Sequence, residues 1–278
     1  IRYCCIEHLH ADRKNHKAFC LAIIKENKRY KLEINDIIKT GKVEAVNNAL
    51  VDAAAGGSLL VVKKLCKKRG DDIDVNAVNN DGRTSLIQSS FSGHIDITTF
   101  LLQIKGIDVN KPTELGTTPL IAASQNGLVE IVTMLLGAES IQVNKSNIQG
   151  GTPLYAASEK NQIEIVKLLL GAEGIEMNQP LDNGATALSV ASQKNYIEIV
   201  KLLIGAAGIN VNEPLKKGIT PLIIASGEGH VEIVKLLLGT EGIEINHPMN
   251  NGGTALGIAK QEKHTEIVQL LTAAGATK

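Results

Sequence analysis

Residues 116–149 read GTTPLIAASQNGLVEIVTMLLGAESIQVNKSNIQ, and this stretch decides the fold because its pattern recurs along the chain every 34 residues. One marker of the period is a threonine, found at Thr84, Thr118, Thr152, Thr186, Thr220 and Thr254. A second marker is an asparagine, found at Asn76, Asn110, Asn144, Asn178, Asn212 and Asn246. A fixed period of this length is typical of repeat architectures. Two markers in register over six copies therefore predict a stack of similar structural units.

Each unit predicts two short helices. Thr118 is a suitable N-cap because its hydroxyl can accept a backbone N–H bond, and Pro119 suits the first helical position. Gly127 should end this first helix, and a second helix should run over about 128–136, with its apolar residues on one stripe. Gly137 then stands where a left-handed C-cap would end the second helix.

The segments between units predict tight, hairpin-like turns. Residues 141–144 read as a short extended arm that leads into the next turn. The pairs Asp81-Gly82, Asn183-Gly184 and Asn251-Gly252 favour a positive φ at the glycine. Helix, turn, helix and hairpin-like turn therefore alternate along the chain.

No single unit can bury its apolar stripe alone, so the units must stack into an all-α solenoid with a nearest-neighbour core. The blocks Gly116-x-Thr118-Pro119-Leu120 and Val231 to Leu238 (VEIVKLLL), followed by Gly242 to Asn246 (GIEIN), resemble the ankyrin repeat. The resemblance covers about 230 residues. Units here are one residue longer than the usual 33 of that family. The family's usual His after Thr-Pro-Leu is replaced by Ile87, Ile121, Tyr155, Ser189, Ile223 and Gly257.

We assign residues 48–278 to this ankyrin repeat domain, with about seven repeats. The first repeat matches both helices but lacks Thr-Pro and has two extra residues near 67–70. The last repeat ends at Lys278 after its second helix and is expected to cap the stack.

Residues 1–22 fall outside the period and carry Cys4, His8, His16 and Cys20. Each Cys–His pair is four residues apart, so each pair can share one face of a helical turn and bind zinc. The spacing resembles the second half of a MYND-type zinc finger, in which Cys4, His16 and Cys20 match and His8 replaces a Cys. Zinc is then expected only if residues before Ile1 complete the finger.

Two other interpretations of this segment stay open. The four side chains could surround a single zinc ion, or the segment could be an amphipathic helix with chance Cys and His. Arg13, which stands where MYND fingers commonly have Trp, departs from the family pattern. Residues 23–47 read as a helical connector in which Gly41 to Val46 echoes a repeat's second helix.

Composition and charge argue against several functions. Basic and acidic residues balance at 29 each, and the basic run from Lys63 to Arg69 lacks interleaved aromatics, so nucleic acid is not the expected partner. No apolar run approaches the ~18 residues that span a membrane. Cysteine usage fits a reducing compartment, cytoplasmic or nuclear, and a monomer is expected.

A search for catalytic groups predicts that the chain is not an enzyme. His94, His230 and His264 occupy one position of the repeat, which indicates a structural role at a helix start. Pairs such as Glu164 and Lys167 fit an exposed helix face. No phosphate-binding loop or nucleophile elbow is present in the sequence.

The expected function is therefore to bind a partner protein, through the concave face of the stack. The resemblance implies contacts from the turn tips and the ends of the first helices, where the sequence varies most between units. Phe91 and Tyr155 are the aromatic residues expected to contribute most to binding. The predicted partner-binding residues are Arg83, Phe91, Glu114, Gln125, Tyr155, Glu159, Lys160, Asp182, Gln193, Lys194, Lys216 and Glu228.

Two alternatives to this function stay open. The finger could be the recognition module, binding short proline-rich peptides, with the repeats as a spacer. The chain could also be the regulatory region of an enzyme whose catalytic domain lies upstream.

Overall fold

The computed structural model describes residues 43–69 and 73–277 of the chain. The predicted zinc ligands and residues 23–42 of the predicted connector lie outside these residues. The first helices of the units are α2 (Val43–Ala55), α4 (Ser85–Ser92), α6 (Pro119–Gln125), α8 (Pro153–Glu159), α10 (Ala187–Gln193), α12 (Pro221–Gly227) and α14 (Ala255–Gln261). The second helices are α3 (Leu59–Arg69), α5 (Ile95–Leu102), α7 (Val129–Leu136), α9 (Ile163–Leu170), α11 (Ile197–Ile204), α13 (Val231–Leu238) and α15 (Thr265–Ala273).

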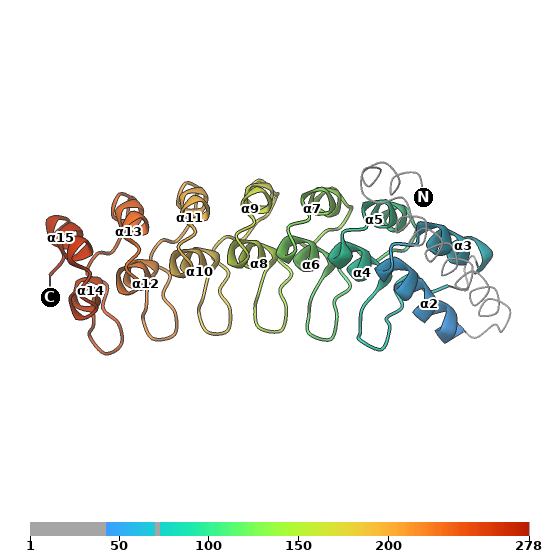
Figure 1. Cartoon of the computed structure of the whole chain (residues 1–278), viewed down its shortest axis with the longest axis horizontal. Helices are drawn as coiled ribbons and strands as arrows, with labels where there is room; N and C mark the ends of the chain where they lie inside the picture. Colours follow the sequence, from blue (N-terminus) through green and yellow to red (C-terminus); the bar gives the residue numbers. More distant parts are fainter. Residues whose placement is uncertain (1–42, 70–72, 278) are drawn as a thin grey trace, which may run out of the picture.

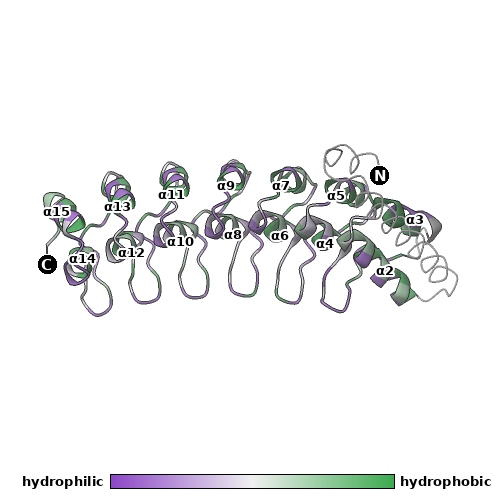
Figure 2. Cartoon of the chain, viewed as in Figure 1, coloured by the Kyte–Doolittle hydropathy of each residue, from purple (hydrophilic) through white to green (hydrophobic). Residues whose placement is uncertain are grey.

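The units form one linear stack, which confirms the predicted solenoid. Figure 1 shows three rows along its length: the second helices, the first helices, and the long loops that precede each first helix from α4 onward. Each first helix packs against the first helix of the next unit, and each second helix against the next second helix. In Figure 2 the second helices carry both hydrophilic and hydrophobic colours, as amphipathic helices should.

Threonine caps begin the first helices as predicted. In six units the threonine Oγ1 accepts a bond from the backbone N–H three residues later, at 3.1 to 3.4 Å. In α6, α8 and α12 the next residue is proline, which has no N–H to leave unsatisfied. A cap of this kind stabilises a helix by about 1 kcal/mol.

The core runs as a continuous layer between the two rows of helices. In the unit of α6 and α7, Leu120, Ile131, Val132 and Leu135 are each at most 1% exposed. The same positions are buried in the neighbouring units, so every unit completes the core of the next. Burying one such side chain stabilises the fold by about 1.5–3 kcal/mol.

The asparagine of each unit ties it to the following unit. The Asn144 side chain donates its N–H to the Gly174 carbonyl at 2.7 Å and accepts the Glu176 backbone N–H at 2.9 Å. Equivalent pairs of bonds are made by Asn76, Asn110, Asn178, Asn212 and Asn246. The second marker of the period is therefore a clamp between units.

The predicted left-handed cap at Gly137 is wrong. Gly137 has a φ of −83°, and the chain continues past α7 in tight turns, with the Ala138 N–H bonded to the Leu135 carbonyl. The left-handed residue comes later, at Ser140, which has a φ of 64°. Because the turn needs these extra residues, the chain reverses three positions after the expected site.

Helix α2 is longer than the other first helices. It begins at Val43, so residues 43–47 of the predicted connector form its start. Its side chains Val46 and Leu50 are each 1% exposed. The first repeat thus lacks the Thr-Pro start of its successors but buries an equivalent apolar stripe.

Candidate functional site: the inner surface

The first helices and the loops that precede them form one face of the stack, which we call the inner surface (Figure 1). Neighbouring loops are joined there by backbone bonds. The Ile148 N–H donates to the Leu115 carbonyl at 3.1 Å, and Asp182, Lys216 and Asn250 each repeat this bond to the preceding loop at 3.0 Å. Gly116 permits this close approach, because a Cβ there would lie 2.7 Å from the Asn147 Cα. The loops therefore form a pre-ordered edge rather than separate mobile segments.

The N-terminal groove lies between α4, α6 and their loops and has a volume of about 600 Å³. Four of the predicted binding residues, Arg83, Phe91, Glu114 and Gln125, line it together. The structure thus gathers onto one site residues that are separated by up to 42 positions in the sequence.

An aromatic side chain is held exposed at this groove. The Arg83 guanidinium lies 5.4 Å from the centre of the Phe91 ring and donates to the Gln88 side-chain oxygen at 3.2 Å. Phe91 is nevertheless 47% exposed. A cation over one ring face fixes the ring while its remaining surface stays in contact with water.

The C-terminal groove lies between the first helices α8 to α14 and their loops and has a volume of about 430 Å³. Three predicted residues, Tyr155, Gln193 and Glu228, line it. Burial raises the pKa of Tyr155, and the negative charge of Glu159 raises it further. The phenol therefore stays protonated and can donate a hydrogen bond at neutral pH.

Three further predicted residues form an ion-pair cluster. The Glu159 carboxylate lies 3.4 Å from the Lys160 ammonium and 3.5 Å from that of Lys194. Lys194 also donates to the Glu159 backbone carbonyl at 3.2 Å, so it spans two units. With two lysines and one glutamate, the cluster keeps a net positive charge.

Asp182 and Lys216 are exposed at loop tips and line neither groove. They share one repeat position with Glu114, since the three are 68 and 34 residues apart, and Asn80 stands there in the earlier unit. Arg83 lies three residues beyond this position and is therefore not a loop-tip residue. Arg83 nevertheless reaches the inner surface through its contact with Phe91.

Two apolar residues of the inner surface were missed. Leu115 is 65% exposed and lines the N-terminal groove, and Ile148 is 63% exposed on the next loop. The sequence could have revealed them, because each is a large aliphatic residue close to a turn glycine, Gly116 or Gly150. Other units hold Asn, Asp, Gln, Glu or Lys at the equivalent positions, so these two side chains depart from a polar pattern.

The histidine position is structural, as predicted. His94, His230 and His264 begin second helices. Each ring Nε2 lies 3.0 Å from a carbonyl oxygen at the end of the preceding unit's first helix. These rings join neighbouring units and do not converge on one site.

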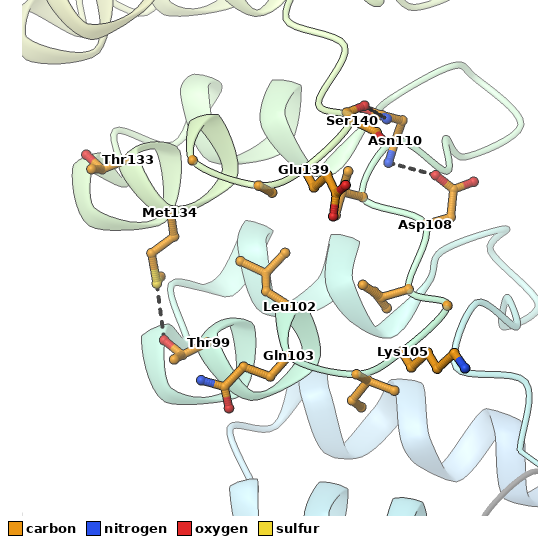
Figure 3. Close-up of a pocket in the computed structure, with 16 residues that line it drawn as sticks. Thr99, Leu102, Gln103, Lys105, Asp108, Asn110, Thr133, Met134, Glu139 and Ser140 are labelled. Carbon is orange, nitrogen blue, oxygen red and sulfur yellow. Dashed lines mark hydrogen bonds between the residues drawn. The ribbon is translucent and has the colours of Figure 1, made fainter.

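Another cavity, of about 790 Å³, lies away from the predicted residues, between the ends of α5 and α7 (Figure 3). Figure 3 shows Thr99 donating to the Met134 sulfur at its side, at 3.1 Å. A similar cavity of about 570 Å³ recurs one unit later, between α7 and α9. This recurrence identifies both as gaps of the repeat geometry.

Within residues 43–69 and 73–277, no group of three or more His, Cys, Asp or Glu side chains is placed to hold a metal ion. The predicted zinc ligands lie before this part of the chain. Cys66 is a free thiol that packs half-buried against the core. Across the same described ranges, no helix combines the length and apolar character that a membrane span requires.

Comparison with known families finds one match. A family model described as ankyrin repeats in three copies matches residues 8–113, 105–180, 142–214 and 188–278, which overlap to cover nearly the whole chain. No curated protein matches the chain.

Proposed function

Because the chain belongs to the ankyrin repeat family, we propose that it is a non-catalytic scaffold that holds a partner protein on its inner surface. Ankyrin repeats indicate a protein–protein interaction module, and proteins built from them are generally non-catalytic. The site residues and the partner's contacts with them are our proposal.

The observation that carries the proposal is the N-terminal groove. Phe91 and Leu115 line it with 47% and 65% of their surfaces exposed, and Ile148 lies on the adjoining loop. Contiguous exposed apolar side chains with a polar rim are typical of interaction sites. An aromatic side chain and an arginine are also the residue types that dominate binding energy at protein interfaces.

Ordered loops favour the same function. Backbone bonds join the successive loops that precede α6 to α14 and fix their tips before a partner arrives. A pre-ordered surface loses less conformational entropy on binding than a mobile one. We also propose a reducing compartment, cytoplasmic or nuclear, as the place where this scaffold works.

The test compares proteins captured from native lysate by the full chain and by two variants. The first variant carries Arg83→Ala and Phe91→Ala in the N-terminal groove. The matched control carries Glu164→Gln and Lys167→Gln, an ion pair on the outer helix α9 that joins side chains at 2.7 Å. Exposed pairs of this kind contribute little to stability, so the control should stay folded.

We expect a partner that the wild type and the control both retain and that the groove variant loses. Truncation of a central anchor residue costs about 2 kcal/mol or more, which is roughly a thirtyfold loss of affinity. Equal capture by all three folded proteins would contradict the proposal for this surface.

A further inference from the structure

We propose that the C-terminal groove is a second docking site, separate from the N-terminal groove. It would select a protein segment with an apolar ridge, acidic side chains along one side and basic side chains along the other. This inference rests on the proposed function and adds the chemistry of the partner.

The floor of the inner surface changes from polar or small to apolar along the stack. At one loop position the earlier units hold Asn79, Thr113 and Asn147, whereas the later units hold Leu181, Leu215 and Met249. On the first helices, Gln88, Ala122 and Ala156 give way to Val190, Ile224 and Ile258. The apolar residues that line the C-terminal groove are Val190, Leu215, Ile219, Ile223, Ile224, Met249 and Ile258.

The loop turn does not need these apolar side chains. In an earlier unit the Asn147 side chain accepts the backbone N–H groups of Gln149 and Gly151, at 3.0 and 2.8 Å. In two later units this role passes to an asparagine two positions further on, Asn183 or Asn251, which accepts a loop N–H at 2.9 or 3.0 Å. The turn is thus kept, while the vacated position carries an apolar side chain, Leu181 or Met249, of which Met249 lines the groove.

A glycine keeps this groove open. Gly227 ends α12 at the position where the other units hold Phe91, Gln125, Glu159, Gln193 and Gln261. A Cβ at Gly227 would lie 3.0 Å from Cγ2 of Ile258, which lines the floor. Any longer side chain there would occupy the space above the apolar residues.

The two rims carry opposite charges. On the loop side, Lys216 and Lys217 directly follow Leu215 and are exposed. On the helix side, Glu228 directly follows Gly227, and Glu262 stands at the same position of the next unit. Lys160 and Lys194 occupy this helix-side position in earlier units, so the sign of the rim reverses at this groove.

These features define the occupant. An apolar ridge would cover the floor, acidic groups would face the lysine pair, and basic groups would face the glutamates. Such opposed rims fix the direction in which a segment lies, because the reversed direction would place like charges together. Residues from four successive units line this open groove, which suits an elongated protein segment better than an enclosed small molecule.

The test uses a displayed library of random 12-residue peptides, selected on the full chain and counter-selected on Gly227→Gln. Glutamine occupies the same position in three other units, and replacing a helical glycine favours the helix, so this variant should fold. Selected peptides are then measured by fluorescence anisotropy against wild type, Gly227→Gln, Glu228→Lys and the double variant Lys216→Glu with Lys217→Glu. The N-terminal groove variant, Phe91→Ala with Arg83→Ala, is the matched control.

We expect enriched peptides with two or more large apolar residues flanked by both charge signs. Gly227→Gln should weaken their binding about tenfold or more, and each rim variant about threefold or more, with the N-terminal groove variant unchanged. When the charge of a peptide is reversed together with the charge of the rim that it faces, the binding affinity should return to that of the wild-type pair.

Other outcomes overturn the inference. It fails if no peptide is enriched on wild type over Gly227→Gln, or if the enriched peptides lack charged residues or ignore the rim variants. If Gly227→Gln has no effect in the lysate experiment while the N-terminal groove variant loses the partner, the second site fails and the proposed function stands. If neither groove variant changes lysate capture, the proposed function itself fails.

Discussion

Single residues, in addition to the apolar core, join the units of this stack. Each clamp asparagine provides one donor and one acceptor to the following unit, as Asn178 does with the Gly208 carbonyl at 2.8 Å and the Asn210 N–H at 2.7 Å. The sequence reveals the position through its period. It does not reveal the role, because the partners lie 30 and 32 residues away and meet the side chain only in the stack.

Asn178→Ala should therefore lower the free energy of unfolding by about 1–3 kcal/mol, since two bonds between units are lost and their backbone partners are left unsatisfied. Urea unfolding followed by circular dichroism measures the change. Asn246→Ala is the matched control, because Asn246 ties only the chain end, through a long bond of 3.4 Å to the Gly275 carbonyl and a bond of 2.7 Å from the Thr277 N–H. An equal loss in both variants would show that the clamp does not act between units.

Backbone conformation gives a second prediction at this scale. Lys263 has a φ of 62°, at a position where four other units hold glycine and two hold asparagine. A left-handed conformation costs a side-chain-bearing residue about 1–2 kcal/mol, of which the entropy lost by a glycine offsets about half. Lys263→Gly should thus slow amide hydrogen exchange in α15 severalfold.

The matched control for this change is Lys260→Gly, three residues earlier and inside α14. Glycine destabilises a right-handed helical position by up to about 1 kcal/mol, so exchange in the last unit should become faster. Two changes of the same chemical kind should therefore have opposite effects. Faster exchange in both would disprove the assignment of strain to Lys263.

The sequence predicts the positions of the helices better than it predicts the other features of the structure. Threonine and proline at the start of a helix act on the backbone of their own first turn, so local chemistry is enough to locate them. Helix ends are less certain, because three units hold two glycines three residues apart, such as Gly171 with a φ of −86° and Gly174 with a φ of 73°. The local sequence indicates that a glycine follows the helix end, but it does not show which of the two glycines adopts the left-handed conformation.

Removing the N-cap of one first helix should lower the stability of the protein by a small amount. Thr152→Ala deletes the acceptor for the Tyr155 N–H at the start of α8 and should destabilise the protein by about 1 kcal/mol. Thr152→Ser keeps the hydroxyl and should retain most of this stability. Thermal unfolding of the two variants measures the difference, and identical losses would assign the cost to the threonine methyl group instead of the cap.

On the scale of the whole molecule, the inner surface was predicted in outline but not in detail. The variable positions located it, and seven of the twelve predicted residues line its two grooves. The apolar floor of the C-terminal groove was not anticipated, because no local feature of the sequence distinguishes Val190 and Ile224 from the buried apolar residues of the same helices. Only the neighbouring loops show that Ile224 is half-buried beside an open groove.

Because each unit contacts only its neighbours, the units in which hydrogen exchange rises should depend on where in the stack a destabilising substitution lies. Leu154 and Leu256 occupy the same position of α8 and α14 and are 1% and 3% exposed. Replacing such a side chain by alanine costs about 2–5 kcal/mol. Leu154→Ala should raise hydrogen exchange in the units on both sides of it, whereas Leu256→Ala should raise exchange only at the C-terminal end. Uniform exchange along both variants would show that the stack unfolds as a single unit.

The asparagine clamps also decide how the molecule would behave under tension. A force applied to the two ends of the chain acts on the clamps one after another, because each clamp joins a unit only to its successor. The unit with the weakest attachment yields first, and its 34 residues extend by roughly 110 Å before the next clamp takes the load. We expect the last unit to yield first, because one of the two Asn246 bonds that hold it, to the Gly275 carbonyl, is long at 3.4 Å. A partner on the N-terminal groove would therefore stay bound while the far end lengthens, so the scaffold could act as an extensible tether between two attached bodies.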